Sequence, residues 1–97
     1  MNQNQPPQEV KVKINDEQLK GSYANMMRVS HQSDAFVLDF AHITPPQGIV
    51  TARVITSPSH LKKMISALQE NLRIYEDRFG QVEERGKTEG EIGFQTS

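Results

Sequence analysis

This chain of 97 residues is long enough for one small domain. Its eleven basic and twelve acidic side chains are interspersed along the sequence, so no segment forms the basic patch that nucleic-acid binding requires. It has no cysteine, so disulfides, thiol catalysis and cysteine-based zinc sites are excluded. No window is apolar enough to span a membrane, and the first residues lack a basic segment followed by an apolar run. We therefore expect a cytoplasmic protein without membrane contact.

Both ends of the chain are polar. Residues 1–8 are mostly Asn, Gln and Pro, and residues 81–97 are rich in Glu, Gly, Lys and Thr. We expect a disordered N-terminal tail and a flexible C-terminal tail, because such segments bury too little apolar area to offset the entropy of ordering. A single domain is predicted over residues 9–80. At that length a lone hydrophobic core is marginal, and oligomerisation is a common remedy.

Four strands are predicted in chain order. In residues 9–14 the apolar side chains Val10, Val12 and Ile14 alternate with charged ones, which is the pattern of a half-buried strand. Turn residues at 15–18 precede a second strand over residues 22–31, and a turn at residues 32–34 leads to a third strand over residues 35–43. The segment 44–48, with Pro45 and Pro46, ends that strand. Residues 49–56 form the fourth.

One long helix follows the strands. Ser57 is suited to the N-cap, Pro58 to the first helical position and Gly80 to the C-cap. The apolar side chains between them fall on one stripe at spacings of three and four: Leu61, Met64, Ile65, Leu68, Leu72, Tyr75 and Phe79. The predicted fold is α+β, with a four-stranded antiparallel meander and one C-terminal helix packed on one sheet face (ββββα).

The third strand is apolar on both faces and contains one carboxylate, Asp39. A loop at residues 44–48 implies the cross-strand pairs Ile43–Ile49, Ala41–Thr51, Asp39–Arg53 and Val37–Ile55. One face then offers a core surface to the helix, formed by Phe36, Leu38, Phe40, Val50, Ala52 and Val54. In the register that we prefer for the second strand, Met27 and Val29 join this core face.

The opposite face is predicted to be an interface. It carries Val37, Ile43, Ile49 and Ile55 around the Asp39–Arg53 pair, with Arg28 beside Asp39. The three charged residues have two interpretations. They could form an anion site or a patch that recognises a partner, since two guanidiniums carry more charge than one carboxylate, or they could form a cross-strand ion pair that fixes the register of the strands. The apolar residues around them favour association, because contiguous apolar patches usually mark an interface.

No catalytic, metal-binding or cofactor-binding residue is predicted. His31, His42 and His60 do not share the spacing of a helical metal pair, and no carboxylate triad accompanies them. The aromatic residues could form a stacking platform for single-stranded nucleic acid, but the surrounding charge is balanced and we expect them in the core. These aromatic residues are Tyr23, Phe36, Phe40, Tyr75 and Phe79.

Several segments together are similar to one bacterial family. They are residues 21–25 (GSYAN), 30–31 (SH), 36–40 (FVLDF), 52–60 (ARVITSPSH), 68–71 (LQEN) and 75–80 (YEDRFG). The chain resembles domain-of-unknown-function family 3467 over nearly all of residues 10–82, although Leu61 stands where a smaller residue is expected. The resemblance implies a small soluble bacterial protein with a strand-rich half and a terminal helix, and it carries no established activity and no catalytic residues to transfer. At fold level alone the layout is similar to the export chaperone SecB and to PUR or Whirly-type modules.

The sequence therefore favours a non-enzymatic binding and oligomerisation module. We expect a homodimer through the helix-free sheet face, or a higher homo-oligomer, that binds an unknown protein partner in the manner of an adaptor or chaperone. The alternative is a nucleic-acid-binding or transcription-associated module that presents Lys11, Lys13, Lys20 and Arg28 to phosphates. A metal-dependent enzyme is a third hypothesis, and elemental analysis would test it.

Overall fold

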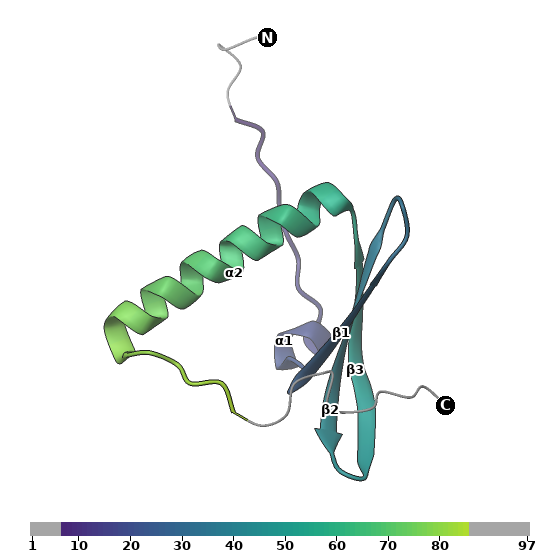
Figure 1. Ribbon diagram of the computed structural model, residues 1–97. Helices are drawn as coiled ribbons and strands as arrows, with labels where there is room; N and C mark the ends of the chain where they lie inside the picture. Colours follow the sequence, from purple (N-terminus) through teal and green to yellow (C-terminus); the bar gives the residue numbers. More distant parts are fainter. Residues whose placement is uncertain (1–6, 86–97) are drawn as a thin grey trace.

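The computed structural model describes residues 7–85 and has an α+β fold (Figure 1). Its elements are α1 (Asp16–Lys20), β1 (Met26–His31), β2 (Phe36–Thr44), β3 (Gln47–Thr56) and α2 (Pro58–Phe79). The three strands form one antiparallel sheet in the order β1-β2-β3. Of the two predicted tails, residues 1–6 and 86–97 lie outside the described residues, while residues 7–8 and 81–85 have no helix or strand.

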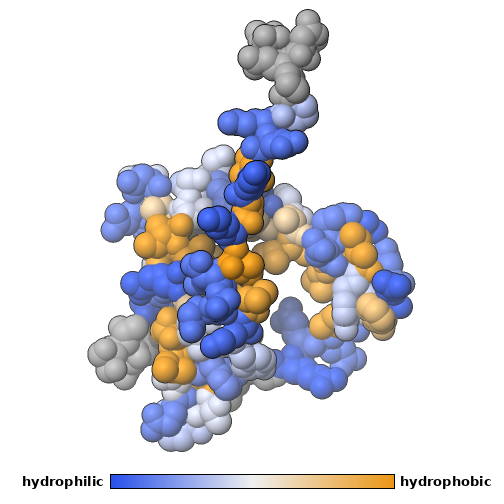
Figure 2. Space-filling view, turned by 180° about the vertical axis from the view of Figure 1, so that it is seen from behind, coloured by the Kyte–Doolittle hydropathy of each residue, from blue (hydrophilic) through white to orange (hydrophobic). Residues whose placement is uncertain are grey.

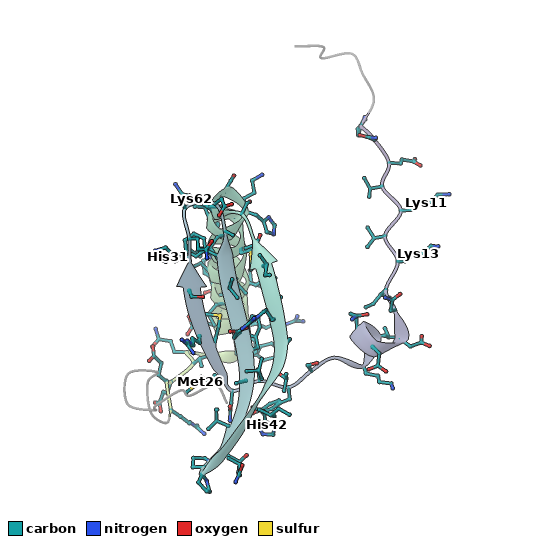
Figure 3. The ribbon with its side chains drawn as sticks, turned by 90° about the vertical axis from the view of Figure 1, so that its right-hand side faces the viewer. Lys11, Lys13, Met26, His31, His42 and Lys62 are labelled. Carbon is teal, nitrogen blue, oxygen red and sulfur yellow. The ribbon has the colours of Figure 1, made fainter. Side chains whose placement is uncertain are left out.

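The predicted first strand is not found. Residues 7–15, which we call the N-terminal arm, pair with no strand of the described chain, and the side chains of Val10, Val12 and Ile14 are exposed. The predicted turn after them contains the short helix α1. In Figure 3 the labelled Lys11 and Lys13 of the arm lie well to one side of the sheet. The predicted four-stranded meander is therefore reduced to three strands in the single chain.

Hydrogen bonds in residues 21–25 explain why the arm does not lie beside β1. The carbonyl oxygen of Tyr23 accepts from Thr51 Oγ1 of β3 at 3.1 Å, two strands away from β1. The Asn25 amide then holds Ile43 of β2, donating to its carbonyl oxygen at 2.9 Å and accepting from its N–H at 2.8 Å. Residues 21–25 thus cross the sheet, which delays the start of β1 from the predicted Ser22 to Met26 and takes α1 to the β3 side.

A β-bulge changes the register of β2 and β3. Thr44 pairs with Gln47, so the turn consists of Pro45 and Pro46 alone, joined by a cis peptide bond, rather than of the predicted residues 44–48. Thr51 has no partner on β2, because Phe40 pairs with Ala52 and Ala41 pairs with Val50. The predicted pairs Asp39–Arg53 and Val37–Ile55 are confirmed. The predicted pairs Ala41–Thr51 and Ile43–Ile49 are wrong: the observed pairs are Ala41–Val50, His42–Ile49 and Ile43–Gly48.

This register defines two faces of the sheet. The inner face carries Met27, Val29, Leu38, Phe40, Ala52 and Val54. It is the helix side: α1 and α2 lie on the same side of the sheet (Figure 1), and Glu17 and Gln18 of α1 line one groove at the β3 edge with Phe40, Ala52 and Val54, which Arg53 also borders. The outer face carries Met26, Arg28, Val37, Asp39, Ala41, Ile43, Val50, Arg53 and Ile55.

The bulge also exchanges two predicted positions. Because partners in an antiparallel pair share a face, Ile49 lies with His42 on the inner face and Val50 lies with Ala41 on the outer face. Both assignments are opposite to those predicted from uninterrupted alternation along β3. Met27 and Val29, in contrast, occupy the inner face as predicted.

Helix α2 has the predicted ends. Ser57 Oγ accepts the N–H of His60 at 3.1 Å, Pro58 is the first helical residue, and Gly80 follows with a φ of 97°. A single residue joins β3 to α2, so the helix must begin at the end of the sheet, and it then leads away from it (Figure 1). Leu61 and Met64 are half-buried, whereas the rest of the apolar stripe is exposed. The prediction that α2 packs along the sheet is therefore wrong beyond its first turns.

The buried core is small. Among the described residues, the buried hydrophobic residues are Met26, Leu38 and Ala41, and the buried charged residue is Asp39. Within residues 7–85, eighteen large hydrophobic residues are exposed. Most of them lie on the N-terminal arm, on both sheet faces and along α2, and Leu19 lies on α1, so apolar surface open to solvent occurs on helices, sheet and arm alike.

Candidate functional site

A charged cluster lies at the centre of the outer face. Arg53 Nε donates to Asp39 Oδ1 at 2.6 Å and Arg53 Nη2 donates to Asp39 Oδ2 at 3.0 Å, which makes a bidentate pair across β2 and β3. Arg28 is the partner of Asp39 on the other side, in β1. The Asp39 side chain is 9% exposed and that of Arg53 is 59% exposed. The carboxylate is thus enclosed while one guanidinium remains accessible.

The two arginines keep this carboxylate ionised. The hydrogen bonds from Arg53 lower the pKa of Asp39 below its usual value, and the positive charges of Arg53 and Arg28 act in the same direction. Removal from water opposes them but is the weaker influence overall. The same contact raises the pKa of Arg53. At neutral pH the three side chains therefore carry one net positive charge.

Apolar side chains surround the cluster. Val37 and Ile43 are half-buried, and Val50 and Ile55 are exposed, Ile55 at 66%. Gly48 makes room for one of them, since a Cβ there would lie 2.5 Å from Ile43 Cδ1. The outer face thus combines an enclosed, hydrogen-bonded ion pair with surrounding apolar side chains, and contiguous apolar patches usually mark an interface.

Six of the seven predicted interface residues are brought together by the sheet. They are Arg28, Val37, Asp39, Ile43, Arg53 and Ile55. Ile49 lies on the inner face, and Val50, which was predicted for the core, takes its place on the outer face. Residues 49–55 are apolar at both odd and even positions near Thr51, so the hydrophobic pattern gave no signal of the bulge.

A second apolar surface was not anticipated as a site. The exposed stripe of α2 and the exposed inner-face residues Met27, Val29 and Val54 lie on the same side of the sheet. In Figure 2 a hollow open to solvent separates α2 from the central part of the molecule, where the N-terminal arm lies in front of the sheet, and hydrophobic residues border the hollow on both sides. Tyr75 and Phe79, predicted to be core residues, form an exposed ring pair with centroids 4.9 Å apart. The signal for this surface is the regular spacing of the stripe.

The three histidines lie in separate places. His31 contacts the Phe36 ring at a centroid distance of 5.3 Å, His42 contacts the Tyr23 ring at 4.9 Å, and His60 is in the first turn of α2. His31 and His42 stand at opposite ends of the sheet (Figure 3). Within residues 7–85, no three His, Cys, Asp or Glu side chains are close enough together to hold a metal ion.

The basic residues considered for phosphate binding do not share one surface. Lys11 and Lys13 are on the N-terminal arm (Figure 3), and Lys20 of α1 lies 3.6 Å from Glu17. Arg28 is on the sheet beside Asp39. None of the helices in the described range has the length and hydropathy required to cross a membrane.

Comparison with known proteins places the chain in one family. A sequence model described as "Protein of unknown function (DUF3467)" matches residues 1–84. The chain belongs to the DUF3467 family. No curated protein and no solved structure shows significant similarity to it. The family description names no activity, and the fold-level analogy with SecB, PUR or Whirly-type modules stays a prediction.

Proposed function

We propose that this DUF3467 protein is a non-enzymatic binding and oligomerisation module that dimerises through the outer face and binds protein partners. The observation that carries the proposal is the enclosure of the Asp39 carboxylate by Arg53 among surrounding apolar side chains. A role as adaptor or chaperone suits a protein that offers apolar surface on several elements. A cytoplasmic location is part of the proposal, and the lack of cysteine favours it.

The ion pair suits an interface between chains. A buried charge is tolerated when it is paired and hydrogen-bonded, and both Asp39 oxygens already accept from Arg53. Covering the cluster would therefore leave no orphaned carboxylate. The surrounding apolar side chains would supply the favourable free energy of association, since burying one aliphatic side chain contributes about 1.5–3 kcal/mol. Arg53 and Arg28 would then set register and partner choice more than affinity.

The four-stranded arrangement belongs to the same proposal. Residues 9–14 have strand-like alternation without a strand partner in the described chain. We expect them to become the fourth strand on a sheet edge in the assembled protein, because β1 and β3 are edge strands that pair with no further strand of residues 7–85. Hydrogen exchange tests this: the Val10 and Val12 amides should be protected at concentrations where the protein is assembled. Exchange at the rate of an unstructured peptide under those conditions would contradict it.

A matched pair of substitutions tests the outer face. Ile49 and Ile55 are both on β3 and both 66% exposed, but they lie on opposite faces of the sheet. Ile55→Asp should abolish association through the outer face, whereas Ile49→Asp should leave the assembly size unchanged. Sedimentation of both variants and the wild type at about tens of micromolar, the range of weak dimers, measures this. Equal assembly sizes for the two variants would overturn the proposal.

The same pair tests the binding of other proteins. Each variant can serve as bait in affinity purification from the native host, with co-purified protein and nucleic acid both identified. A protein partner of the outer face should be retained by Ile49→Asp and lost with Ile55→Asp. Recovery of nucleic acid by both baits, surviving salt above about 200 mM, would favour the nucleic-acid-binding alternative instead.

A further inference from the structure

The apolar stripe of α2 has the spacing of a coiled-coil seam. Leu61, Ile65, Leu68, Leu72, Tyr75 and Phe79 follow one another at intervals of four, three, four, three and four residues. This alternation assigns them to the a and d positions of the heptad repeat, which form the contact line between paired helices. All of them except Leu61 are exposed in the single chain. The helix therefore presents a complete seam without a second helix.

The position of α2 leaves room for that second helix. The C-terminal half of α2 stands away from the sheet across the hollow seen in Figure 2. Met27, Val29 and Val54 are exposed on the inner face of the sheet, on the same side as the hollow. A helix placed in the hollow would contact both the seam and the inner face. The N-terminal arm does not fill this role, because its apolar side chains Val10, Val12 and Ile14 are themselves exposed.

The charges beside the seam identify the occupant. One flank carries Lys62, Gln69 and Glu76, each seven residues from the next and all at the e position of the heptad. In an antiparallel pair the e positions of the two helices face each other. Two copies of α2 crossing at Gln69 would place Lys62 of each copy opposite Glu76 of the other. The flank is thus complementary to itself, which is the requirement for a two-fold interface between identical chains.

A parallel pair lacks this complementarity. There the g position of one helix faces the e position of the next heptad in the other, which would set Met64 against Gln69 and Asn71 against Glu76. Neither combination is an attraction between opposite charges. On the solvent side of α2, Arg73 is already occupied with Glu70 at 2.6 Å and Asp77 at 2.8 Å. These ion pairs stay outside the seam.

We propose that α2 pairs with α2 of a second copy of this chain as an antiparallel coiled coil centred on Gln69. Tyr75 and Phe79 of each copy then enter the hollow of the other copy and cover Val29 and Val54, at the end of its inner face from which α2 starts. This α2–α2 contact lies on the opposite side of the sheet from the outer face, so it goes beyond the proposed function. Either the α2–α2 contact or the outer-face contact can be absent while the other is present. With both contacts the protein is larger than a dimer, and loss of either one leaves a dimer.

Another matched pair of substitutions tests the seam. Leu72 and Ile74 are both 50% exposed on α2, but they point in directions about 200° apart around the helix axis. The dissociation constant of the full-length chain is measured by sedimentation in an Ile55→Asp background, which removes any contribution of the outer face. Leu72→Asp should raise it by about 100-fold or more, since two leucines leave the seam. Ile74→Asp should change it by less than about threefold.

A charge exchange tests the antiparallel register. Lys62→Glu should raise the dissociation constant about tenfold, because two attractions between Lys62 and the half-buried Glu76, whose Oε2 also accepts the N–H of Val82, become repulsions. Adding Glu76→Lys should restore the wild-type value to within about threefold. Equal effects of Leu72→Asp and Ile74→Asp would overturn the coiled coil, and failure of the second charge change to restore affinity would overturn the register. If the wild type is a dimer, only one of the two contacts exists. Dissociation of that dimer by Ile55→Asp would identify the outer face, and dissociation by Leu72→Asp would identify the seam of α2.

Spin labels distinguish the two helix directions, and the lack of cysteine in the chain makes single labelling straightforward. A label at Ser59→Cys lies ten residues from Gln69, so an antiparallel pair separates the two labels by about 30 Å along the helix axis. A parallel pair would bring them to about the distance between helices, about 10 Å. Distances near 10 Å would overturn the antiparallel arrangement, and distances of 30 Å or more would support it.

Discussion

Arg53 encloses the Asp39 carboxylate with two parallel hydrogen bonds, at 2.6 and 3.0 Å, and the neighbours of Asp39 in β2 from Phe36 to Ala41 are all apolar. A one-residue slip between β2 and β3 would move Arg53 to the other face of the sheet and leave Asp39 without these bonds. The pair therefore specifies the register of the hairpin on one side of the bulge. It also makes the stability of the hairpin depend on the ionisation of one carboxyl group.

Acid should destabilise the protein through Asp39. Its pKa is lowered in the folded state, mainly by the hydrogen bonds from Arg53, so the folded state favours the ionised carboxylate. The resulting stabilisation is present above the unfolded-state pKa, about 3.9, and is lost as the pH falls through the lowered folded-state pKa. Urea unfolding between pH 7 and pH 2 should show this loss. Asp39→Asn should be less stable at pH 7 and should have a flatter acid dependence than the wild type.

The control is Asp34→Asn, in the exposed loop between β1 and β2. It makes the same chemical change without touching an arginine pair, and we expect it to keep the acid dependence of the wild type. If Asp39→Asn and Asp34→Asn gave the same profile, the acid sensitivity would arise elsewhere in the chain. Because the protein is proposed to associate, all three profiles require one fixed protein concentration.

The N-cap of α2 should contribute measurably to stability. Ser57 Oγ accepts the N–H of His60 at 3.1 Å, which satisfies one of the backbone donors at the helix start. Ser57→Ala should lower the free energy of unfolding by about 0.5–2 kcal/mol. Ser59→Ala, two residues later in the first turn, removes a hydroxyl that is not the cap and should cost less. The helical circular dichroism signal during urea unfolding measures both, and equal losses would contradict a capping role.

Gly48 and Ile43 should be coupled. A Cβ at position 48 would lie 2.5 Å from Ile43 Cδ1, so Gly48→Ala requires this side chain to move. We expect Gly48→Ala to destabilise the protein by about 1–3 kcal/mol, as overpacking usually does. Ile43→Val removes the Cδ1 atom, so the double variant should be more stable than the sum of the single effects implies. Strict additivity in urea unfolding would show that the two side chains do not meet.

The features that sequence predicted correctly depend on local chemistry. Ser57, Pro58 and Gly80 define the ends of α2 because helix ends have specific residue preferences, and α2 has those ends. The predicted Asp39–Arg53 pair rested on a loop at residues 44–48. The structure has a two-residue turn there, and the bulge at Thr51 restores the predicted register from the Phe40–Ala52 pair to the Phe36–Thr56 pair. The helix ends, in contrast, need no knowledge of contacts between distant segments.

The features that sequence missed depend on such contacts. Residues 9–14 alternate as a strand does, but the hydrogen bonds of Tyr23 and Asn25 carry the chain across the sheet and away from β1. The stripe of α2 indicates an amphipathic helix without saying which surface covers it, and in the single chain most of it remains exposed. A pattern of buried positions predicts burial, but it does not distinguish burial within a chain from burial between chains.

The hydrogen bond from the Thr51 hydroxyl should hold residues 21–25 against the sheet. Its Oγ1 lies 3.1 Å from the carbonyl oxygen of Tyr23 and 3.3 Å from that of Phe40, and it is the extra residue of the bulge. Thr51→Val keeps the β-branched shape but removes the donor, and it should cost about 0.5–1.5 kcal/mol. Amide hydrogen exchange should also accelerate in residues 22–25, while the pairing of β2 with β3 is retained. Thr44→Val, at the exposed end of β2, should change neither quantity; equal acceleration in both variants would mean that Thr51 does not hold this segment in place.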